Sequence, residues 1–201
     1  QKDTSRYIEK LNIKNSNSGP VTSADLKANE MIIQGIKKYF PKANWGFLSE
    51  ENYKKKSETV FPQDWIWIID PLDGTKDFIN RTGEYAVHIA LTHQKKVVLS
   101  VVLIPSKEEL WFFLDGEGSW CESKNSEQKL IQEINSKMIS ELKVVISRSY
   151  RPQELIYLLE KLKPLQVIGM GSVGYKIISI IKGEADLYIS YPIKGKSSPK
   201  D

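Results

Sequence analysis

The chain has 201 residues, of which 40% are hydrophobic and 27% charged, as in an ordinary globular protein of one domain or two packed halves. Its net charge of +4 suits an anionic ligand but is too small to indicate nucleic acid by itself. One cysteine and two histidines exclude a structural zinc site and an intramolecular disulfide. Carboxylate oxygens would therefore have to hold any metal ion, which favours Mg²⁺, Mn²⁺ or Ca²⁺.

No run of 18 or more apolar residues is present, so the sequence predicts no transmembrane helix and no membrane partner. The lack of a disulfide fits a reducing compartment, and we expect a cytoplasmic protein. Because the chain begins with Gln1 and not with Met, the missing signal peptide is weak evidence for this location.

The first part of the chain predicts one long helix followed by strands. Residues 1–20 are polar and typical of a loop. Thr22 or Ser23 can cap a helix over 24–40, where apolar residues recur at helical spacing. The strands expected after it are 45–48, 65–69, 85–92, 97–104 and 110–114, with a solvated loop at 52–59 between the first two.

The polar stretch 121–137 is expected to divide the chain into an N-terminal half, residues 1–141, and a C-terminal half, residues 142–201. The second half alternates between strands at 142–147, 165–168 and 185–191 and helices at 153–162 and 173–181. This mixture predicts an α/β protein with layered helices and sheets.

The segment Asp70-Pro-Leu-Asp-Gly-Thr75 follows the continuous apolar run at 65–69, which predicts a strand covered on both faces. Asp70 and Asp73 then place two carboxylates close together, a costly arrangement unless a cation bridges them. Thr75 adds a hydroxyl and an N–H at a helix start, which suits a phosphate. A simple capped turn explains the same residue types equally well, whereas an EF-hand is excluded because Arg81 occupies the place of its final Glu.

Two more acidic segments precede it in order: Pro20-Val-Thr-Ser-Ala-Asp25 at a helix start and Leu48-Ser-Glu-Glu51 after a short strand. Together with Gly116-Glu-Gly-Ser-Trp120, a Gly-x-Gly-aromatic turn, these segments resemble the Mg²⁺-dependent, lithium-sensitive phosphatase superfamily. Its members include inositol monophosphatase, fructose bisphosphatase and 3'(2'),5'-bisphosphate nucleotidase. The match runs from about residue 20 onward. It implies the inositol monophosphatase/sugar phosphatase fold, with alternating helix and sheet layers (αβαβα).

The resemblance implies a metal site for two or three Mg²⁺ ions. Glu50, Asp70 and Asp73 would be ligands, with the backbone carbonyl of Leu72 as another. Glu51 would be a surface acid or would lie beside a ligand.

The same resemblance implies the catalytic groups. Gly74 and Thr75 would offer N–H groups to the phosphate, while the Thr75 hydroxyl and Asp25 would orient and deprotonate a water held by the metal, near Glu50. The water would attack phosphorus in line, and the metal ions would clamp the phosphate and stabilise the leaving oxygen.

Substrate residues are expected in the second half. The segment 144–150 resembles the Ser-Arg-Ser-His motif of the bisphosphate nucleotidase branch, so Ser147 and Arg148 would touch a second phosphate or a base; Tyr150 replaces the His. Ser172 would contact substrate at a helix start, and Lys176 resembles a lysine that meets the non-scissile phosphate. The structural alternative for the first pair is a strand end with an ordinary surface Arg148. The structural alternative for Lys176 is a solvated lysine on a helix.

Gly169-Met-Gly-Ser-Val-Gly174 also spells the dinucleotide-binding pattern Gly-x-Gly-x-x-Gly. That fold requires an acid at the end of the next strand, about 20 residues on. Residues 189–193 contain no acid, so we favour the phosphatase interpretation. His88 lies in an alternating strand and is interpreted as structural.

The leading hypothesis is a Mg²⁺-dependent phosphomonoesterase of sulfur assimilation that acts on a small phosphate ester, 3'-phosphoadenosine 5'-phosphate. An inositol monophosphatase or sugar bisphosphatase is the alternative with the same chemistry, and a non-catalytic anion- or nucleic-acid-binding protein is the alternative of another class. A homodimer is compatible with each of them.

Relatives of this superfamily also carry a helix before the segment 20–25 and a metal-binding Asp in a Trp-Asp-x-Ala-Ala segment. Asp201 follows Lys200 and not Trp, so it is not equated with that ligand. The resemblance thus predicts that both halves lack a segment, the first helix of one and the end of the other.

Overall fold

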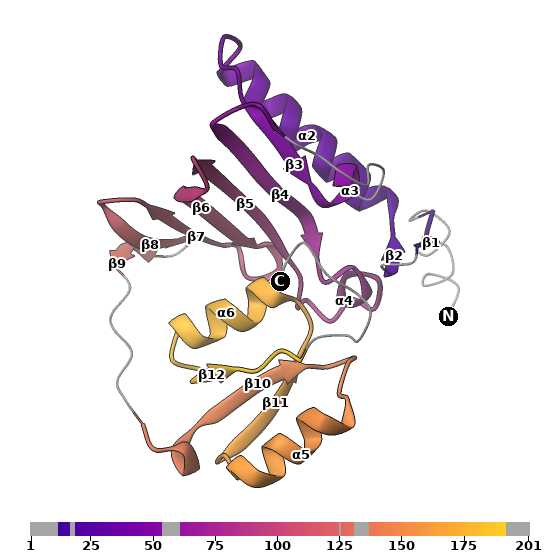
Figure 1. The fold of residues 1–201 in the computed structure, drawn as a ribbon, viewed down its shortest axis with the longest axis vertical. Coiled ribbons are helices and arrows are strands. Elements are labelled where there is room, and N and C mark those ends of the chain that lie inside the picture. Colours follow the sequence, from indigo (N-terminus) through magenta and orange to yellow (C-terminus); the bar gives the residue numbers. More distant parts are fainter. Residues whose placement is uncertain (1–11, 17–18, 54–60, 125, 131–136, 192–201) are drawn as a thin grey trace. The chain divides into compact units, whose positions relative to one another are not determined.

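A computed structural model describes residues 12–16, 19–53, 61–124, 126–130 and 137–191. The chain divides into two compact units, residues 1–131 and 132–201, which are considered separately. Figure 1 shows a broad sheet in the first unit and a smaller three-stranded sheet in the second. None of the helices within the described ranges is both long and apolar enough to cross a membrane.

The first unit is built on a seven-stranded sheet of order β3-β4-β5-β6-β7-β8-β9. Strands β3 and β4 are parallel, and every later neighbour is antiparallel. The strands are β3 (Gly46–Ser49), β4 (Trp65–Asp73), β5 (Ala86–His93), β6 (Lys96–Ile104), β7 (Glu109–Leu114), β8 (Gly118–Ser123) and β9 (Ser126–Leu130). Short helices α3 (Glu50–Tyr53) and α4 (Thr75–Ile79) follow β3 and β4, and the 3-10 turn η1 (Pro105–Lys107) links β6 to β7.

Helix α2 (Ser23–Tyr39) runs along β3 and β4 (Figure 1), and its bounds confirm the predicted helix within one residue. Trp67 and Ile69 of β4 are buried. The ring of Trp45 packs edge-on against Trp67, with centroids 5.6 Å apart, and also contacts Phe40 just after α2. Burial of this aromatic surface fixes the position of β4, and therefore also that of the segment after residue 69.

Three sequence predictions for this unit require correction. The predicted loop 1–20 contains a small antiparallel hairpin, β1 (Lys14–Ser16) with β2 (Gly19–Val21). Strand β4 continues through Asp73, past the predicted end at Ile69. The predicted polar divider 121–137 contains the end of β8 and all of β9, because backbone pairing of β8 to β7 and of β9 to β8 organises this polar stretch. Most of the predicted loop 52–59 lies outside the described residues.

The second unit is a parallel α/β unit: β10 (Lys143–Ser147), α5 (Gln153–Leu162), β11 (Gln166–Met170), α6 (Val173–Ile181) and β12 (Leu187–Tyr188). The 3-10 turn η2 (Ile139–Glu141) precedes it. Both helices have the predicted bounds, whereas β12 has only two residues of the predicted 185–191. Val144, Ile146 and Leu155 form its buried core. The strand order is β11-β10-β12, so the chain crosses from one side of β10 to the other. The carboxyl end of β10 is therefore a topological switch point, the place where sheets of this kind bind ligands.

The side chain of Asp186, just before β12, forms a hydrogen bond with the start of β10. This side chain is 5% exposed and accepts hydrogen bonds from Lys137 Nζ at 2.6 Å and the Lys143 backbone N–H at 2.8 Å. These bonds, with the Lys137 bond as the larger cause, hold the pKa of Asp186 below its usual value.

We therefore expect Asp186→Asn to destabilise the protein by roughly 1–3 kcal/mol at neutral pH, the range for a lost charge-assisted hydrogen bond. Because the folded pKa is lowered, the carboxylate stabilises the fold above its unfolded pKa of about 4, and this contribution is lost as pH falls through the folded value. Urea unfolding at pH 6 and pH 3 measures the effect. The difference between wild type and variant should shrink at pH 3; a difference independent of pH would contradict it.

Candidate active site

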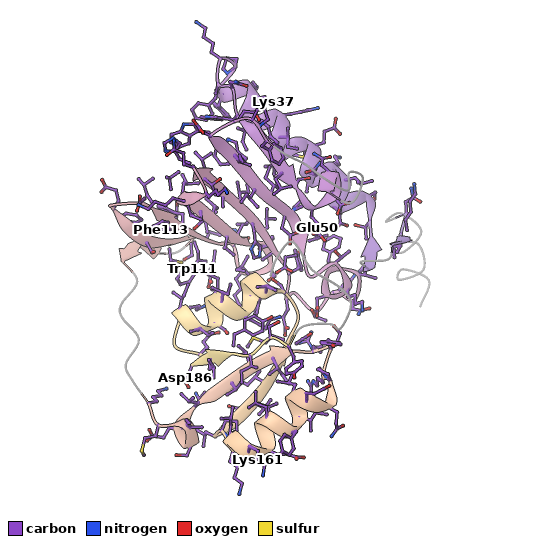
Figure 2. All side chains as sticks on the ribbon, in the orientation of Figure 1. Lys37, Glu50, Trp111, Phe113, Lys161 and Asp186 are labelled. Atoms are coloured by element: carbon purple, nitrogen blue, oxygen red, sulfur yellow. The ribbon has the colours of Figure 1, made fainter. Side chains whose placement is uncertain are left out.

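The carboxyl ends of β3 and β4 bring two acidic residues to the same sheet edge. The strands are parallel, and Ser49 is aligned with Ile69, so the backbones of the next residues, Glu50 and Asp70, follow side by side. Glu50, labelled in Figure 2, opens α3, and Asp70 is half-buried within β4. The structure thus brings together two residues separated by twenty positions in the sequence.

Strand β4 becomes irregular just after Asp70, which brings Asp73 into the same segment. The pairing with β5 shifts register between Asp70 and Asp73, with Pro71 and Leu72 buried between them. Asp73 is itself buried, at 6% exposure. A bulge of this kind redirects side chains, and such irregularities are common beside active sites.

Gly74 provides the sharp turn from β4 into α4. Its φ of 89° lies in the left-handed region, which other residues adopt only at a cost. Thr75 is then the first residue of α4, so its backbone N–H has no acceptor earlier in the helix. The structure confirms the predicted helix start at Thr75.

The hydroxyl of Thr75 connects this segment to the start of α2. Thr75 Oγ1 lies 3.0 Å from Asp25 Oδ1 and 3.2 Å from the Leu72 carbonyl oxygen, so it can donate to either. Asp25 is 3% exposed, and its Oδ2 accepts hydrogen bonds from the N–H and the hydroxyl of Thr22. The N-cap of α2 therefore holds one carboxylate oxygen of Asp25 and leaves the other facing Thr75.

The donor set at this edge fits a hard divalent cation. Glu50, Asp70 and Asp73 supply carboxylates, and the Leu72 carbonyl has a second lone pair beside its contact with Thr75. Oxygen donors alone favour Mg²⁺ over softer metals. In the ranges that the structure describes, no three His, Cys, Asp or Glu side chains converge closely enough to hold a metal ion between them, so binding would require these carboxylates to turn toward one another.

The burial of Glu51 differs from the expectation of a surface acid. Its side chain is buried, at 5% exposure, so the surface-acid interpretation is wrong. The short turn of α3 directs it inward, and two adjacent glutamates in a sequence carry no signal of which one will be buried.

In the second unit, Ser147 and Arg148 lie at the carboxyl end of β10, the switch point of the small sheet. Ser147 Oγ accepts a hydrogen bond from the Tyr150 N–H at 3.2 Å, and the exposed Arg148 donates to the Gly169 carbonyl oxygen at 3.4 Å. Gly169 packs so tightly that a Cβ on it would collide with the guanidinium of Arg151. Arg151 is thus a second arginine at this edge that the sequence analysis did not identify.

Ser172 and Lys176 follow the neighbouring strand β11. Ser172 is the N-cap of α6 and accepts a hydrogen bond from the Tyr175 N–H at 3.1 Å. Lys176 is 2% exposed: its Nζ donates to the Gly171 carbonyl oxygen at 2.5 Å and lies 5.0 Å from the Tyr188 ring centroid. The interpretation of Lys176 as a solvated helix residue is therefore wrong. All four predicted substrate residues share the carboxyl edge of β10 and β11.

The Gly-x-Gly-x-x-Gly pattern does not form a dinucleotide-binding turn. Gly169 lies inside β11, so the first glycine of the pattern does not make the tight turn that a dinucleotide site requires. Strand β12, which follows, ends without an acidic residue. The structure agrees with the sequence-based prediction that this segment is not a dinucleotide-binding site.

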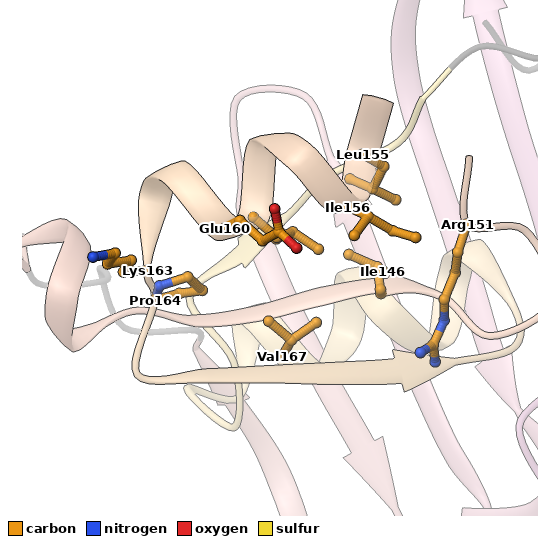
Figure 3. A pocket seen from close by; sticks show the side chains of 9 residues that line it. Ile146, Arg151, Leu155, Ile156, Glu160, Lys163, Pro164 and Val167 are labelled. Atoms are coloured by element: carbon orange, nitrogen blue, oxygen red, sulfur yellow. The ribbon is translucent and has the colours of Figure 1, made fainter. Parts of the chain in front are cut away.

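A pocket also opens between α5 and β11, but the predicted substrate residues do not line it. Figure 3 shows its apolar lining, with Leu155 on the side of α5 and Val167 on the side of β11, and with Arg151 toward one end and Lys163 toward the other. The predicted substrate residues Ser147, Arg148, Ser172 and Lys176 are absent from the lining of this apolar groove.

Comparison with known proteins identifies the class. The Inositol monophosphatase family matches residues 2–197, so the chain belongs to the inositol monophosphatase family, a family of phosphatases. This confirms the predicted superfamily and its α/β layered fold.

Particular relatives refine the comparison. The chain is 36% identical over 171 residues to the 3'(2'),5'-bisphosphate nucleotidase CysQ of Salmonella typhimurium, covering 84% of this chain and 65% of that one. It is 30% identical over 183 residues to inositol monophosphatase 1 of Rattus norvegicus, covering 88% of this chain and 64% of that one. The chain thus spans about two thirds of the length of these curated relatives.

Solved structures share the fold. A staphylococcal IMPase-I complexed with products superposes with a TM-score of 0.76 at 21% identity, over 94% of this chain and 69% of that one. An IMPase/NADP phosphatase complexed with Mg²⁺ and phosphate gives a TM-score of 0.72, also at 21% identity, over 92% of this chain and 69% of that one.

Proposed function

We propose that the protein is a Mg²⁺-dependent phosphomonoesterase that removes the 3'-phosphate from 3'-phosphoadenosine 5'-phosphate. The observation that carries this proposal is the hydrogen bond between Thr75 Oγ1 and the buried Asp25 Oδ1, at the edge where β4 presents Asp70 and Asp73. A hydroxyl held by a carboxylate next to a carboxylate-rich edge is suited to remove a proton from water beside a bound phosphate. The 36% identity to a CysQ nucleotidase supports the choice of substrate.

The reaction is the hydrolysis of a phosphate ester. A water oxygen attacks phosphorus, the bond between phosphorus and the 3' oxygen breaks, and its electron pair goes to that oxygen. Thr75 Oγ1 donates to Asp25 Oδ1, which leaves a lone pair on Oγ1 to accept a proton from the water. Asp25 takes the proton that Thr75 relays and later releases it to solvent. The departing 3' oxygen takes a proton from a solvent water and becomes a hydroxyl, so the products are adenosine 5'-phosphate and inorganic phosphate.

Glu50, Asp70, Asp73 and the Leu72 carbonyl are the groups that we propose hold Mg²⁺, with two or three ions in the enzyme. When bound, Mg²⁺ lowers the pKa of water and neutralises charge on the phosphate and the leaving oxygen. The N–H groups of Gly74 and Thr75 would orient the phosphate at the start of α4. Because phosphoryl transfer needs little covalent help, positioning of this kind is the main task of the protein.

Substrate choice is assigned to the second unit. We propose that Ser147, Arg148, Ser172 and Lys176 bind the 5'-phosphate or the base. A guanidinium suits a dianionic phosphate because it donates two parallel hydrogen bonds. Arg148 is exposed at the switch point of its sheet, where such a ligand would reach it.

An inositol monophosphatase is the second candidate, supported by the 30% identity to the rat enzyme. Phosphate release with Mg²⁺ should be compared for 3'-phosphoadenosine 5'-phosphate and inositol 1-phosphate, with and without Li⁺. We expect a higher kcat/KM for the nucleotide and inhibition by Li⁺. Equal or better turnover of the inositol ester would overturn the nucleotide assignment, and binding without any release would favour the non-catalytic alternative.

Arg148→Ala tests the substrate assignment directly. We expect KM for 3'-phosphoadenosine 5'-phosphate to rise roughly tenfold, since a lost hydrogen bond to a charged group is worth about 1.5 kcal/mol or more. KM for adenosine 3'-phosphate, which lacks the 5'-phosphate, should change little. Lys161→Ala, an exposed charge change on α5, is the control. An equal rise for both nucleotides would contradict a role in binding the 5'-phosphate.

A further inference from the structure

His88 lies on the strand that borders the proposed metal ligands. On β5 it is directly opposite Asp70 of β4, and the next aligned pair after the register shift is Asp73 with Ala86. His88 therefore faces the irregular part of β4, where both aspartates emerge. The interpretation of this residue as merely structural rested on strand alternation alone, which does not reveal what lies across the sheet.

The imidazole is close to one aspartate in particular. His88 Nε2 lies 3.2 Å from Asp73 Oδ2, with the two side chains 27% and 8% exposed. Nε2 itself is buried and, within the described part of the chain, makes no aligned hydrogen bond. The separation is already that of a hydrogen bond, so a small rotation of the ring would align an N–H with the carboxylate.

We propose that His88 is a positioning residue that holds the Asp73 carboxylate in its metal-binding orientation. This inference rests on the proposed function, in which Asp73 is a Mg²⁺ ligand. Groups that hydrogen-bond to a metal ligand fix its orientation and tune its affinity, and their loss typically weakens metal binding about 10–100-fold. The bulge makes such a support valuable because it leaves Pro71 and Leu72, the two residues before Asp73, out of the regular pairing with β5.

The other histidine of the chain provides a matched control. His93 lies on the same strand, at its opposite end, and its ring stacks on Trp65 with centroids 4.2 Å apart. Its removal deletes an imidazole from β5 without touching Asp73. Any effect common to His88→Ala and His93→Ala would thus reflect the stability of the sheet and not the orientation of a ligand.

The test is Mg²⁺ titration by calorimetry, together with the rise in Tm that Mg²⁺ produces. We expect His88→Ala to weaken Mg²⁺ binding about 10–100-fold and to reduce that rise in Tm, while His93→Ala leaves the affinity unchanged. His88→Gln, whose amide can donate from a similar position, should recover most of the affinity and covers the case in which His88→Ala does not fold. If His88 were purely structural, His88→Ala would lower Tm by the same amount with and without Mg²⁺.

The outcomes separate this inference from the function on which it rests. If wild type binds Mg²⁺, His88→Ala binds it as weakly as Asp73→Asn, and His88→Gln recovers most of the affinity, His88 and Asp73 act as a unit. Wild-type affinity in a folded His88→Ala, or a His88→Gln no better than a folded His88→Ala, would overturn the positioning role and leave the phosphatase proposal intact. A wild-type protein that binds no Mg²⁺ would overturn both.

Discussion

Asp70→Asn is expected to lower Mg²⁺-dependent phosphate release by on the order of 10³-fold, the equivalent of about 4 kcal/mol of transition-state stabilisation. Asparagine keeps the size and one oxygen of the side chain but removes the negative charge that a divalent cation requires. Asp70 stands beside the start of α3 and three residues before Asp73, so the change removes charge from the middle of the proposed donor set. Calorimetric titration should show at least a tenfold weaker affinity for Mg²⁺.

The control is Asp115→Asn, which removes the same charge from an exposed ion pair with Lys96. An exposed pair of this kind contributes about 1 kcal/mol or less, so both activity and Mg²⁺ affinity should remain near wild type. A Tm measurement shows that each variant is folded. If Asp70→Asn retains more than a tenth of the activity, or binds Mg²⁺ like wild type, the metal assignment at this edge is wrong.

Local patterns in the sequence predict the helices of this chain well. The apolar spacing and the Thr22 cap define α2, and the amphipathic runs define α5 and α6 with their observed bounds. Helical hydrogen bonds connect residues four apart, so the information that specifies a helix lies within a short window. The same locality explains why the turn after β4 is visible in the sequence, since Gly74 marks the left-handed conformation there.

Features that depend on pairing between distant segments could not be predicted. Strand β9 is polar and becomes a strand only because β8 is beside it. The contact between His88 and Asp73 depends on the register of β5 against β4 and on a bulge that no local sequence pattern predicts. The position of Lys176 likewise depends on Tyr188 of β12, whose ring centroid lies 5.0 Å from Lys176 Nζ. Long-range register is set by the summed packing of whole strands, which a single-sequence pattern does not contain.

The pair formed by Asp25 and Thr75 shows how the two kinds of information combine. The capping box of Thr22 and Asp25 is local, whereas the hydrogen bond to Thr75 spans fifty positions. Thr75→Val keeps the shape of the side chain but removes its hydroxyl. The proposed proton relay then has no atom to accept from water, so we expect kcat to fall about 10²–10⁴-fold, with KM changing less than threefold because the backbone N–H groups at the start of α4 remain.

Thr75→Ser, which retains a hydroxyl, provides the matched control, and we expect it to keep kcat within about tenfold of wild type. Steady-state kinetics at saturating Mg²⁺ measure kcat and KM, while calorimetry should find Mg²⁺ affinity nearly unchanged in both variants, since Thr75 is not a proposed ligand. Asp25→Asn should lose a similar factor in kcat, because an amide cannot take the proton that Thr75 would relay. Near-wild-type kcat in Thr75→Val would show that water is activated elsewhere. A parallel loss of Mg²⁺ affinity would instead mean that Thr75 acts through the neighbouring Leu72 carbonyl, which its hydroxyl also contacts at 3.2 Å.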